Sequence, residues 1–291
     1  MNVEKLSLVL LDLFRRASTR LPCDVVAALE ACQGREEPGS RAAGILDALR
    51  ENNALAADNQ TPICQDTGTA VFFFKLPGTP VPLETLQTAA WQAARLATSE
   101  GLLRQNTIDT LTGSPIDGNA APGAPACYFE SGGGDALEVS LLLKGGGSEN
   151  VSRQYALPDE DLKAGRDLAG VRACVLDAVW RAQGKGCAPG IIGVCVGGDR
   201  ASGHLCAKKQ LLRPLDDESP DPQLAALERQ LLADANALGI GPMGLGGAST
   251  LLGVKAAVLP RLPASYFVSI AYCCWAARRA GVRVALNGDV L

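Results

Sequence analysis

Ten cysteines in a chain of 291 residues with a single histidine make thiol chemistry the first possibility to examine. Three of them lie among turn-forming residues: Cys64 in a polar segment, Cys187 in a Gly/Pro-rich segment, and Cys274 directly before Trp275. A thiol in such a loop is accessible to a metal ion or a reaction, whereas a thiol in an apolar run is usually buried and inert. This contrast points to soft-metal chemistry.

The remaining cysteines mostly fit the interiors of helices and strands, which favours core packing. These core candidates are Cys23, Cys32, Cys127, Cys174 and Cys195, while Cys206 stays undecided. The three loop cysteines are 123 and 87 residues apart, which matches no local ligand motif. Spacing alone therefore leaves both a three-cysteine metal site and inert thiols open. The only histidine, His204, excludes His-rich zinc sites and is expected on an exposed helix face.

Composition limits the class of protein. The chain is 47% hydrophobic and 20% charged, which indicates a globular protein with a sizeable core. A net charge of -4 without a basic stripe argues against a nucleic-acid partner. The apolar runs are too short to cross a membrane, and the polar start of the chain does not resemble a signal peptide. We therefore expect a cytoplasmic protein, in which ten cysteines do not form a disulfide framework.

Periodicity and turn residues predict the order of helices and strands. Helices are expected over 3–17, 24–32, 40–57 with Ser40 as N-cap, 83–99, 159–181, 203–212 and 223–238. Strands are expected over 70–76, 124–130, 137–144, 191–196, 251–259, 266–273 and 282–286; 124–130 and 137–144 are joined as a hairpin, and 213–222 forms an exposed loop. The mixture lacks a regular βαβ repeat, so we predict an α+β fold with a helix-rich N-terminal part. No linker divides the chain, which predicts a single domain over 1–291.

Two glycine-rich segments could bind a ligand through their backbone. Residues 239–244 match GxGxxG literally, but they follow a predicted helix, and Pro242 removes an N–H that a pyrophosphate would need. We reject a nucleotide site there and expect the glycines to allow close backbone approach. Residues 144–150 place three glycines after a strand, where consecutive N–H groups could hold a carboxylate. A flexible turn explains the second segment equally well.

Taken together, these loops resemble the α subunit of the iron–sulfur hydro-lyases, the class I fumarate hydratases and L-tartrate dehydratases. The matching segments, in the family's order, are 62–68, 144–150, 186–189 with 197–200, 239–244, and 274–276 ahead of Arg278-Arg279. The resemblance implies a [4Fe-4S] cluster held by Cys64, Cys187 and Cys274, with cluster-binding loops between the elements. Two departures concern Cys273, which stands beside Cys274, and Ala248, where some relatives carry lysine.

The resemblance also implies the residues around the substrate, a C4 dicarboxylate. Gln65, Asp66, Arg104 and Gly146 are expected to contact it. Arginine suits this role because its guanidinium matches the two oxygens of a carboxylate. Asp66 is expected to be catalytic, exchanging protons with the departing water, and capping the turn before Gly68 is the structural alternative.

Three thiolates would leave one iron of a cubane without a protein ligand, as an open Lewis acid. The reaction expected from the resemblance is fumarate/(S)-malate interconversion, with dehydration of L-tartrate to oxaloacetate as the alternative. The resemblance further implies a separate β subunit and an α2β2 heterotetramer. Two rival interpretations remain: a non-catalytic iron–sulfur sensor, and a scaffold whose thiols are structural.

Overall fold

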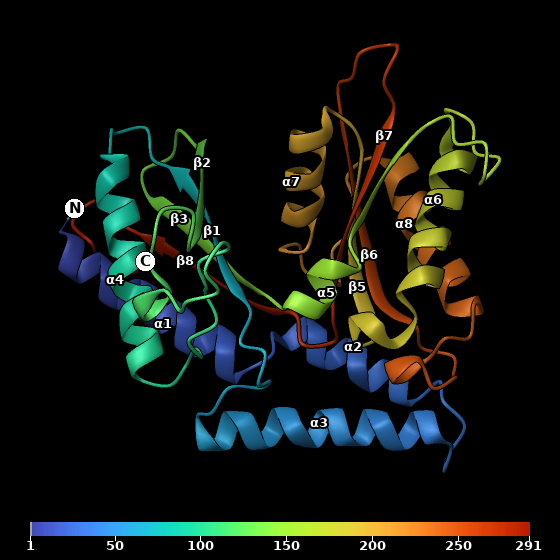
Figure 1. Cartoon of the computed structure of the whole chain (residues 1–291), viewed down its shortest axis with the longest axis horizontal. Coiled ribbons are helices and arrows are strands. Elements are labelled where there is room, and N and C mark those ends of the chain that lie inside the picture. Colours follow the sequence, from blue (N-terminus) through green and yellow to red (C-terminus); the bar gives the residue numbers. More distant parts are fainter. Residues whose placement is uncertain (1) are drawn as a thin grey trace. The chain divides into compact units, whose positions relative to one another are not determined.

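The computed structural model describes residues 2–291, which fold into two compact units (Figure 1). Unit 1 comprises residues 2–22, Glu51–Gly146 and Arg278–Leu291; unit 2 comprises Cys23–Arg50 and Gly147–Ala277. Each unit joins segments that are far apart in the sequence, so no single linker separates them. The single-domain interpretation of 1–291 remains a prediction.

Unit 1 is a four-stranded sheet with two long helices. Its elements are α1 (Val3–Thr19), β1 (Thr69–Leu76), α4 (Leu83–Ser99), η1 (Asp117–Asn119), β2 (Ala126–Ser131), β3 (Leu137–Lys144) and β8 (Arg278–Val284). The strand order is β2-β1-β3-β8, with β1 parallel to β2 and antiparallel to β3. Leu10 and Phe14 of α1 pack with Phe72 and Phe74 of β1 in the core. Asn2 caps α1 by accepting a hydrogen bond from the Lys5 N–H.

The predicted hairpin between 124–130 and 137–144 is wrong, because β1 lies between the two strands. The glycine-rich link instead crosses the end of β1, where the Gly132 N–H donates to the Leu76 carbonyl. The physical reason lies in β1, whose three consecutive phenylalanines are buried. Such a strand is stabilised by neighbours on both edges, and Phe74 stacks on Phe129 of β2.

Unit 2 contains the second sheet, in the order β4-β7-β5-β6. Its elements are α2 (Cys23–Gln33), β4 (Arg153–Ala156), α6 (Leu168–Ala182), η2 (Gln183–Gly186), β5 (Gly190–Gly197), α7 (Arg200–Gln210), α8 (Pro222–Ala237), η3 (Pro242–Gly244), β6 (Leu251–Leu259) and β7 (Phe267–Cys273). Helices α3 (Arg41–Asn59) and α5 (Gly146–Asn150) contain residues of both units. Ser40 caps α3 through the Ala43 N–H, as predicted. The core combines β5, β6 and β7 with α6 and α8.

Some predicted boundaries are wrong. The helix expected over 159–181 starts only at Leu168, because Asp167 caps it and the residues before it form turns around Asp159. The last strand runs from Arg278 to Val284 rather than over 282–286. Cys23 is exposed at the start of α2 rather than buried in the core, and His204 is half-buried in α7 rather than exposed.

The loop over 213–222 is anchored rather than freely exposed. Lys255, which is 4% exposed, donates to the carbonyl of Leu215 and to the carboxylate of Asp217 at 2.6 Å. Arg213 donates to both oxygens of Asp217 and reaches the buried Glu228 at 2.7 Å. Charged residues of the loop pair with Lys255 on β6 and Glu228 on α8. A hydrophilic composition alone does not distinguish such an anchored loop from a freely exposed one.

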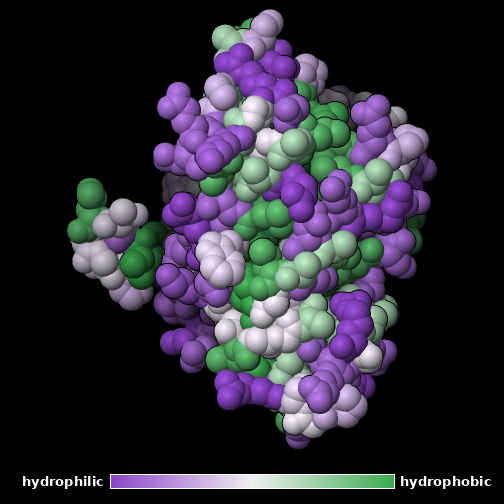
Figure 2. All heavy atoms as spheres, turned by 90° about the vertical axis from the view of Figure 1, so that its right-hand side faces the viewer, coloured by the Kyte–Doolittle hydropathy of each residue, from purple (hydrophilic) through white to green (hydrophobic). Residues whose placement is uncertain are grey.

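Together the mixed sheets and helices confirm the α+β class. Figure 2 shows the side of unit 2 that carries α6 and α8, where apolar groups alternate with hydrophilic ones. The exposed apolar side chains of α6 include Leu168 and Trp180. Within residues 2–291, none of the helices combines the length and the apolar character that a membrane span requires.

Candidate functional site

The predicted catalytic residue Asp66 sits in a tight turn of unit 1, half-buried, with both carboxylate oxygens engaged. Its Oδ1 accepts a hydrogen bond from the Gly68 N–H at 3.0 Å, and its Oδ2 accepts one from the Gly146 N–H at 2.8 Å. Asp66 therefore does cap its own turn, and it also joins that turn to the glycine-rich segment after β3. The two backbone donors fix the direction of the carboxylate.

Arg278 holds the same turn from beneath. Its side chain is 1% exposed, and its Nη1 donates to the Asp66 carbonyl at 2.6 Å. Its Nε is buried and finds no hydrogen-bond acceptor within residues 2–291. Gly145 leaves room for this arrangement, since a Cβ there would lie 3.2 Å from Asp66 Oδ2 and 3.6 Å from Arg278 Nη2. Arg278 follows the Cys274 segment that resembles the family, but the sequence alone indicates no role for it.

The segment that carries Arg104 is fixed to the Asp66 turn through Thr67. The Thr67 hydroxyl oxygen accepts from the Arg104 N–H at 3.0 Å and from the Asn106 amide at 2.9 Å. Asn119 donates to the Arg104 carbonyl at 2.8 Å from the other side. The exposed Arg104 guanidinium lies 3.4 Å from the carbonyl of Gln65. Four predicted residues, Gln65, Asp66, Arg104 and Gly146, thus come together in unit 1.

The glycine-rich segment 144–150 already uses part of its backbone in hydrogen bonds within the chain. Gly145 is buried, and residues 146–150 form the single-turn helix α5. Because the Gly146 N–H donates to Asp66, it is occupied in this structure. The alternative of a flexible turn is wrong, since the segment is helical and hydrogen-bonded across 80 residues of sequence.

Cys187 and Cys274 come together in unit 2. The Trp275 N–H donates to the Cys187 carbonyl at 3.2 Å, which joins the two cysteine loops. Cys187 is exposed and has a positive φ of 53°, while Cys274 is half-buried just after β7. Burial, followed by the nearby thiols of both residues and of Cys273, raises the pKa of Tyr272. Tyr272 therefore marks the place where the two loops meet.

Tyr272 also explains two glycines of the Cys187 loop. A Cβ at Gly186 would lie 2.5 Å from the Tyr272 ring, and one at Gly190 would lie 2.4 Å from it. Real Cβ atoms do not approach so closely, so only glycine allows the ring to pack under the loop. The loop's geometry is thereby set by a buried aromatic side chain.

The GxGxxG segment, residues 239–244, packs against the Cys187 loop. The Met243 N–H donates to the Ala188 carbonyl at 2.8 Å, and a Cβ at Gly244 would lie 2.6 Å from the backbone nitrogen of Gly184. The glycines permit close approach of two backbones of this chain, as expected when the nucleotide interpretation was rejected. No helix starts after the segment; a strand, β6, follows it.

Cys64 belongs to unit 1 and is half-buried. The preceding residue, Ile63, is buried, and its backbone is hydrogen-bonded to Ser18 and to the Asn52 amide, both at 2.9 Å. Within residues 2–291, no group of three or more His, Cys, Asp or Glu side chains is close enough together to hold a metal ion. The three-cysteine ligand set therefore remains a prediction.

The other cysteines differ chemically from these three. Burial raises the pKa of Cys127 and of Cys174 to about 12, so both stay protonated and poorly reactive near neutral pH. Cys195 is buried in β5 and is hydrogen-bonded to Cys206 of α7. Cys273 is 1% exposed and pairs with Ile191 inside the sheet, which makes it a poorer ligand candidate than Cys274.

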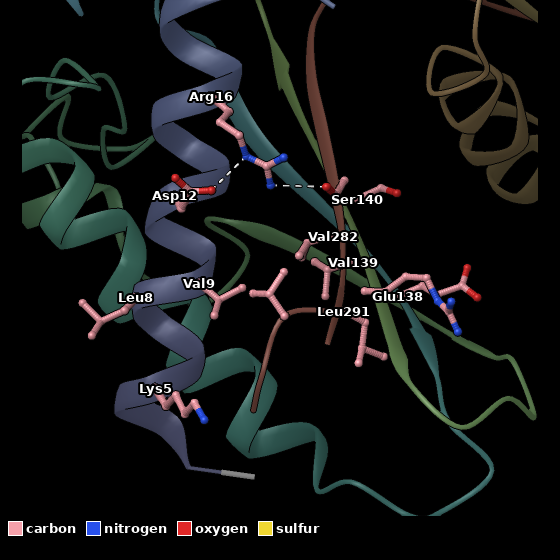
Figure 3. Close-up of a pocket in the computed structure, with 13 residues that line it drawn as sticks. Lys5, Leu8, Val9, Asp12, Arg16, Glu138, Val139, Ser140, Val282 and Leu291 are labelled. Carbon is pink, nitrogen blue, oxygen red and sulfur yellow. Dashed lines mark hydrogen bonds and ion pairs between the residues drawn. The ribbon is translucent and has the colours of Figure 1, made fainter. Parts of the chain in front are cut away.

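A separate groove of about 810 Å³ lies between α1, β3 and β8 in unit 1 (Figure 3). It is lined by apolar side chains such as Val9, Val139 and Val282, and its rim includes the Asp12–Arg16 ion pair. The residues described as lining it include none of the predicted site residues. This groove is therefore distinct from the group of residues around Asp66.

The fold and the loops agree with the comparison to known families. Residues 8–283 match the sequence profile of the family described as fumarate hydratase (Fumerase). The chain belongs to the fumarate hydratase family, as its loops predicted.

Individual relatives carry two kinds of name. A Geobacillus stearothermophilus protein, provisionally named fumarate hydratase class I, is 45% identical over 99% of this chain and 57% of its own length. A Methanocaldococcus jannaschii protein, provisionally named L(+)-tartrate dehydratase subunit alpha, is 35% identical over 98% of this chain and 100% of its own length. The L(+)-tartrate dehydratase subunit alpha of Escherichia coli is 31% identical over 97% and 91%. The chain thus spans little more than half of the first relative.

Proposed function

We propose that this chain is the α subunit of a [4Fe-4S]-dependent hydro-lyase that interconverts fumarate and (S)-malate. The observation that carries the proposal is the family match over residues 8–283, which includes all three cysteine loops and the Asp66 turn. The names of these relatives are those of enzymes that add water to, or remove it from, a C4 dicarboxylate. We further propose a cytoplasmic location.

The donor set fits an iron–sulfur cluster. Cys64, Cys187 and Cys274 lie in loops and are exposed or half-buried, whereas most of the other thiols are inside the core. Thiolates are the ligands that iron–sulfur clusters use, and three of them would leave one iron open. When bound, such a cluster supplies a Lewis acid for the oxygen atoms of the substrate. The Tyr272 ring, packed against Gly186 and Gly190 of the Cys187 loop, supports the backbone of that loop for this role.

The residues of unit 1 would bind and orient the substrate. The Arg104 guanidinium is exposed beside Gln65 and can take a substrate carboxylate in a bidentate manner. Asp66 is held by two backbone donors, which orients its carboxylate for proton exchange at a defined position. Arg278 acts through Asp66 by fixing its carbonyl, and is a positioning residue.

A partner chain is part of the proposal. Relatives that match this chain over nearly their whole length are named subunit alpha, which supports a β subunit. We propose that the two chains assemble as an α2β2 heterotetramer. The test is co-expression of the chain with the candidate partner, followed by anaerobic assay of each chain alone and of the complex. Strong turnover by the purified single chain would contradict the requirement for a partner.

The ligand assignment is tested by Cys→Ser changes at positions 64, 187 and 274, with Cys32→Ser as a control in the core. Iron content and visible absorbance are measured after anaerobic reconstitution. Each loop variant is expected to lose the stable cluster, and the control should keep it. A loop variant with a full cluster and full activity would refute that ligand, and Cys273→Ser would be tested next.

L-Tartrate dehydration to oxaloacetate is the second candidate, favoured by the names of the relatives of similar length. The two substrates differ by one hydroxyl group, which a site with a buried polar partner distinguishes strongly. The test is kcat/KM for both substrates on the complex. A preference for tartrate above about tenfold, roughly 1.4 kcal/mol, would overturn the fumarate assignment. A cluster without turnover of either diacid would favour the sensor interpretation.

A further inference from the structure

The end of α2 and the loop before β6 enclose a carboxylate that lacks an ion pair. Glu36 is 8% exposed, and its Oε2 accepts one hydrogen bond, from the Ala248 N–H at 2.9 Å. Its Oε1 is buried and has no hydrogen-bond donor within residues 2–291. No ion pair of Glu36 is found in the described part of the chain. A buried carboxylate in this condition is costly unless a cation or a proton neutralises it.

A second buried oxygen without a donor in the described residues, the hydroxyl of Ser249, lies in the loop before β6. Ser249, directly after Ala248, is completely buried, and its Oγ has no nitrogen or oxygen donor within residues 2–291. The thiol of Cys32 lies beside both groups, since its pKa responds first to burial, then to Ser249, Arg35 and Glu36. The Arg35 guanidinium makes no ion pair with Glu36 in the described residues, and its Nη2 donates to Cys32 Sγ at 2.9 Å.

The backbone leaves space beside the carboxylate. Gly247 has a φ of 130°, and a Cβ there would lie 2.8 Å from Glu36 Oε2 and 2.8 Å from the Ala42 side chain. The buried amide oxygen Oε1 of Gln33, in the last turn of α2, also lacks a donor in the residues described. Three oxygen acceptors without donors therefore occur in two segments that meet at the Ala248 N–H.

We propose that Glu36 and Ser249 form a binding site for a small monovalent cation in unit 2. Oxygen atoms from a carboxylate, a hydroxyl and an amide are ligands for hard cations. The site offers one carboxylate, so a single positive charge neutralises it, whereas Mg²⁺ and Ca²⁺ sites generally use more carboxylate ligands. A cation would contact several of these oxygens at once and would hold the end of α2 against the loop 244–249.

The test measures thermal unfolding of the full-length chain in about 0.15 M chloride of K⁺, Na⁺, NH₄⁺ or tetramethylammonium. Equal ionic strength keeps general screening constant, and the methyl groups of the last cation keep its charge from direct contact with an oxygen ligand. At least one small cation is expected to raise Tm by about 2–4 °C or more, in a saturable manner. The same Tm in all four salts would overturn the proposal and assign the oxygens to water or to a proton.

Variants separate the site from general salt effects. Glu36→Gln keeps the shape and removes the charge, so the cation-specific rise in Tm should disappear. The exposed neighbour Glu37 supplies the matched control, Glu37→Gln, which should respond like the unmodified chain. Ser249→Ala is isosteric enough to fold, and it should move the midpoint of the cation titration to at least about threefold higher concentration. An unchanged titration in both Glu36→Gln and Ser249→Ala would contradict the assignment.

Discussion

Replacing Asp66 by asparagine separates a catalytic carboxylate from a structural cap. The amide oxygen can replace one carboxylate oxygen as an acceptor, but the amide NH₂ then faces a backbone N–H of Gly68 or Gly146. One hydrogen bond to a charged acceptor is lost, which costs about 1.5–3 kcal/mol. For a chain of this size, the expected fall in Tm is about 3–12 °C. This loss is expected whether or not Asp66 takes part in the reaction.

The kinetic result distinguishes the two roles. If Asp66 exchanges the proton, kcat of the assembled complex should fall by about 100-fold or more, measured at a temperature where the variant is folded and its cluster content is normal. Asp109→Asn is the control, because this exposed carboxylate caps a turn of unit 1 through the N–H groups of Leu111 and Thr112. It should leave kcat unchanged. A kcat/KM within about threefold of the original in Asp66→Asn would refute the catalytic role.

The remaining predictions concern the partner, the buried ion network and the Tyr272 contact. The isolated chain should show negligible turnover, and co-purification with its β subunit should restore it, as measured by anaerobic malate consumption. Lys255→Met should lower the free energy of unfolding by about 3 kcal/mol, because it removes the buried partner of Asp217. As a control, Arg229→Met at an exposed ion pair should change it by less than about 1 kcal/mol. Denaturant unfolding measures both variants. Gly190→Ala should disturb the Cys187 loop and reduce cluster retention while the fold persists, as measured by iron content and circular dichroism.

The ion pairs of Asp217 with Arg213 and Lys255 make the stability of the fold depend on pH in acid. Burial alone would raise the pKa of Asp217, but hydrogen bonds from Arg213 and Lys255 outweigh it and lower the pKa below its usual value. A carboxyl with a lowered folded-state pKa contributes stability that is complete above its unfolded pKa, about 3.9. That contribution is lost as pH falls through the folded pKa. Unfolding in Lys255→Met should therefore depend less on pH below about 4 than unfolding of the original chain.

Local patterns predicted most of the helices and strands, whereas Gln65, Asp66, Arg104 and Gly146 were expected from the family resemblance, and their roles in the reaction stay a prediction. Helical periodicity predicted α1 and α4 almost to the residue, because an amphipathic face is a local property of the sequence. Pairing between strands is not local. The link 131–135 has the composition of a hairpin turn, yet the apolar β1 takes the place between β2 and β3. Similarly, Cys23 falls in a helical pattern, but only the packed structure shows that its position at the start of α2 is exposed.

Arg278 illustrates what sequence alone could not predict. An arginine near a cysteine motif suggests a ligand for the substrate, whereas the structure buries its side chain and directs Nη1 at a backbone carbonyl. Tyr272 and Arg278 perform comparable tasks in the two units. Tyr272 packs against the Cys187 loop, where Gly186 and Gly190 leave room for its ring. Arg278 donates to the backbone of the Asp66 turn, and Gly145 leaves room for its guanidinium. Both are large buried side chains close to glycine backbones, so the loops they support have little freedom to relax. The loops for which we propose the chemistry can therefore carry exposed or half-buried side chains, because large buried neighbours fix their backbones.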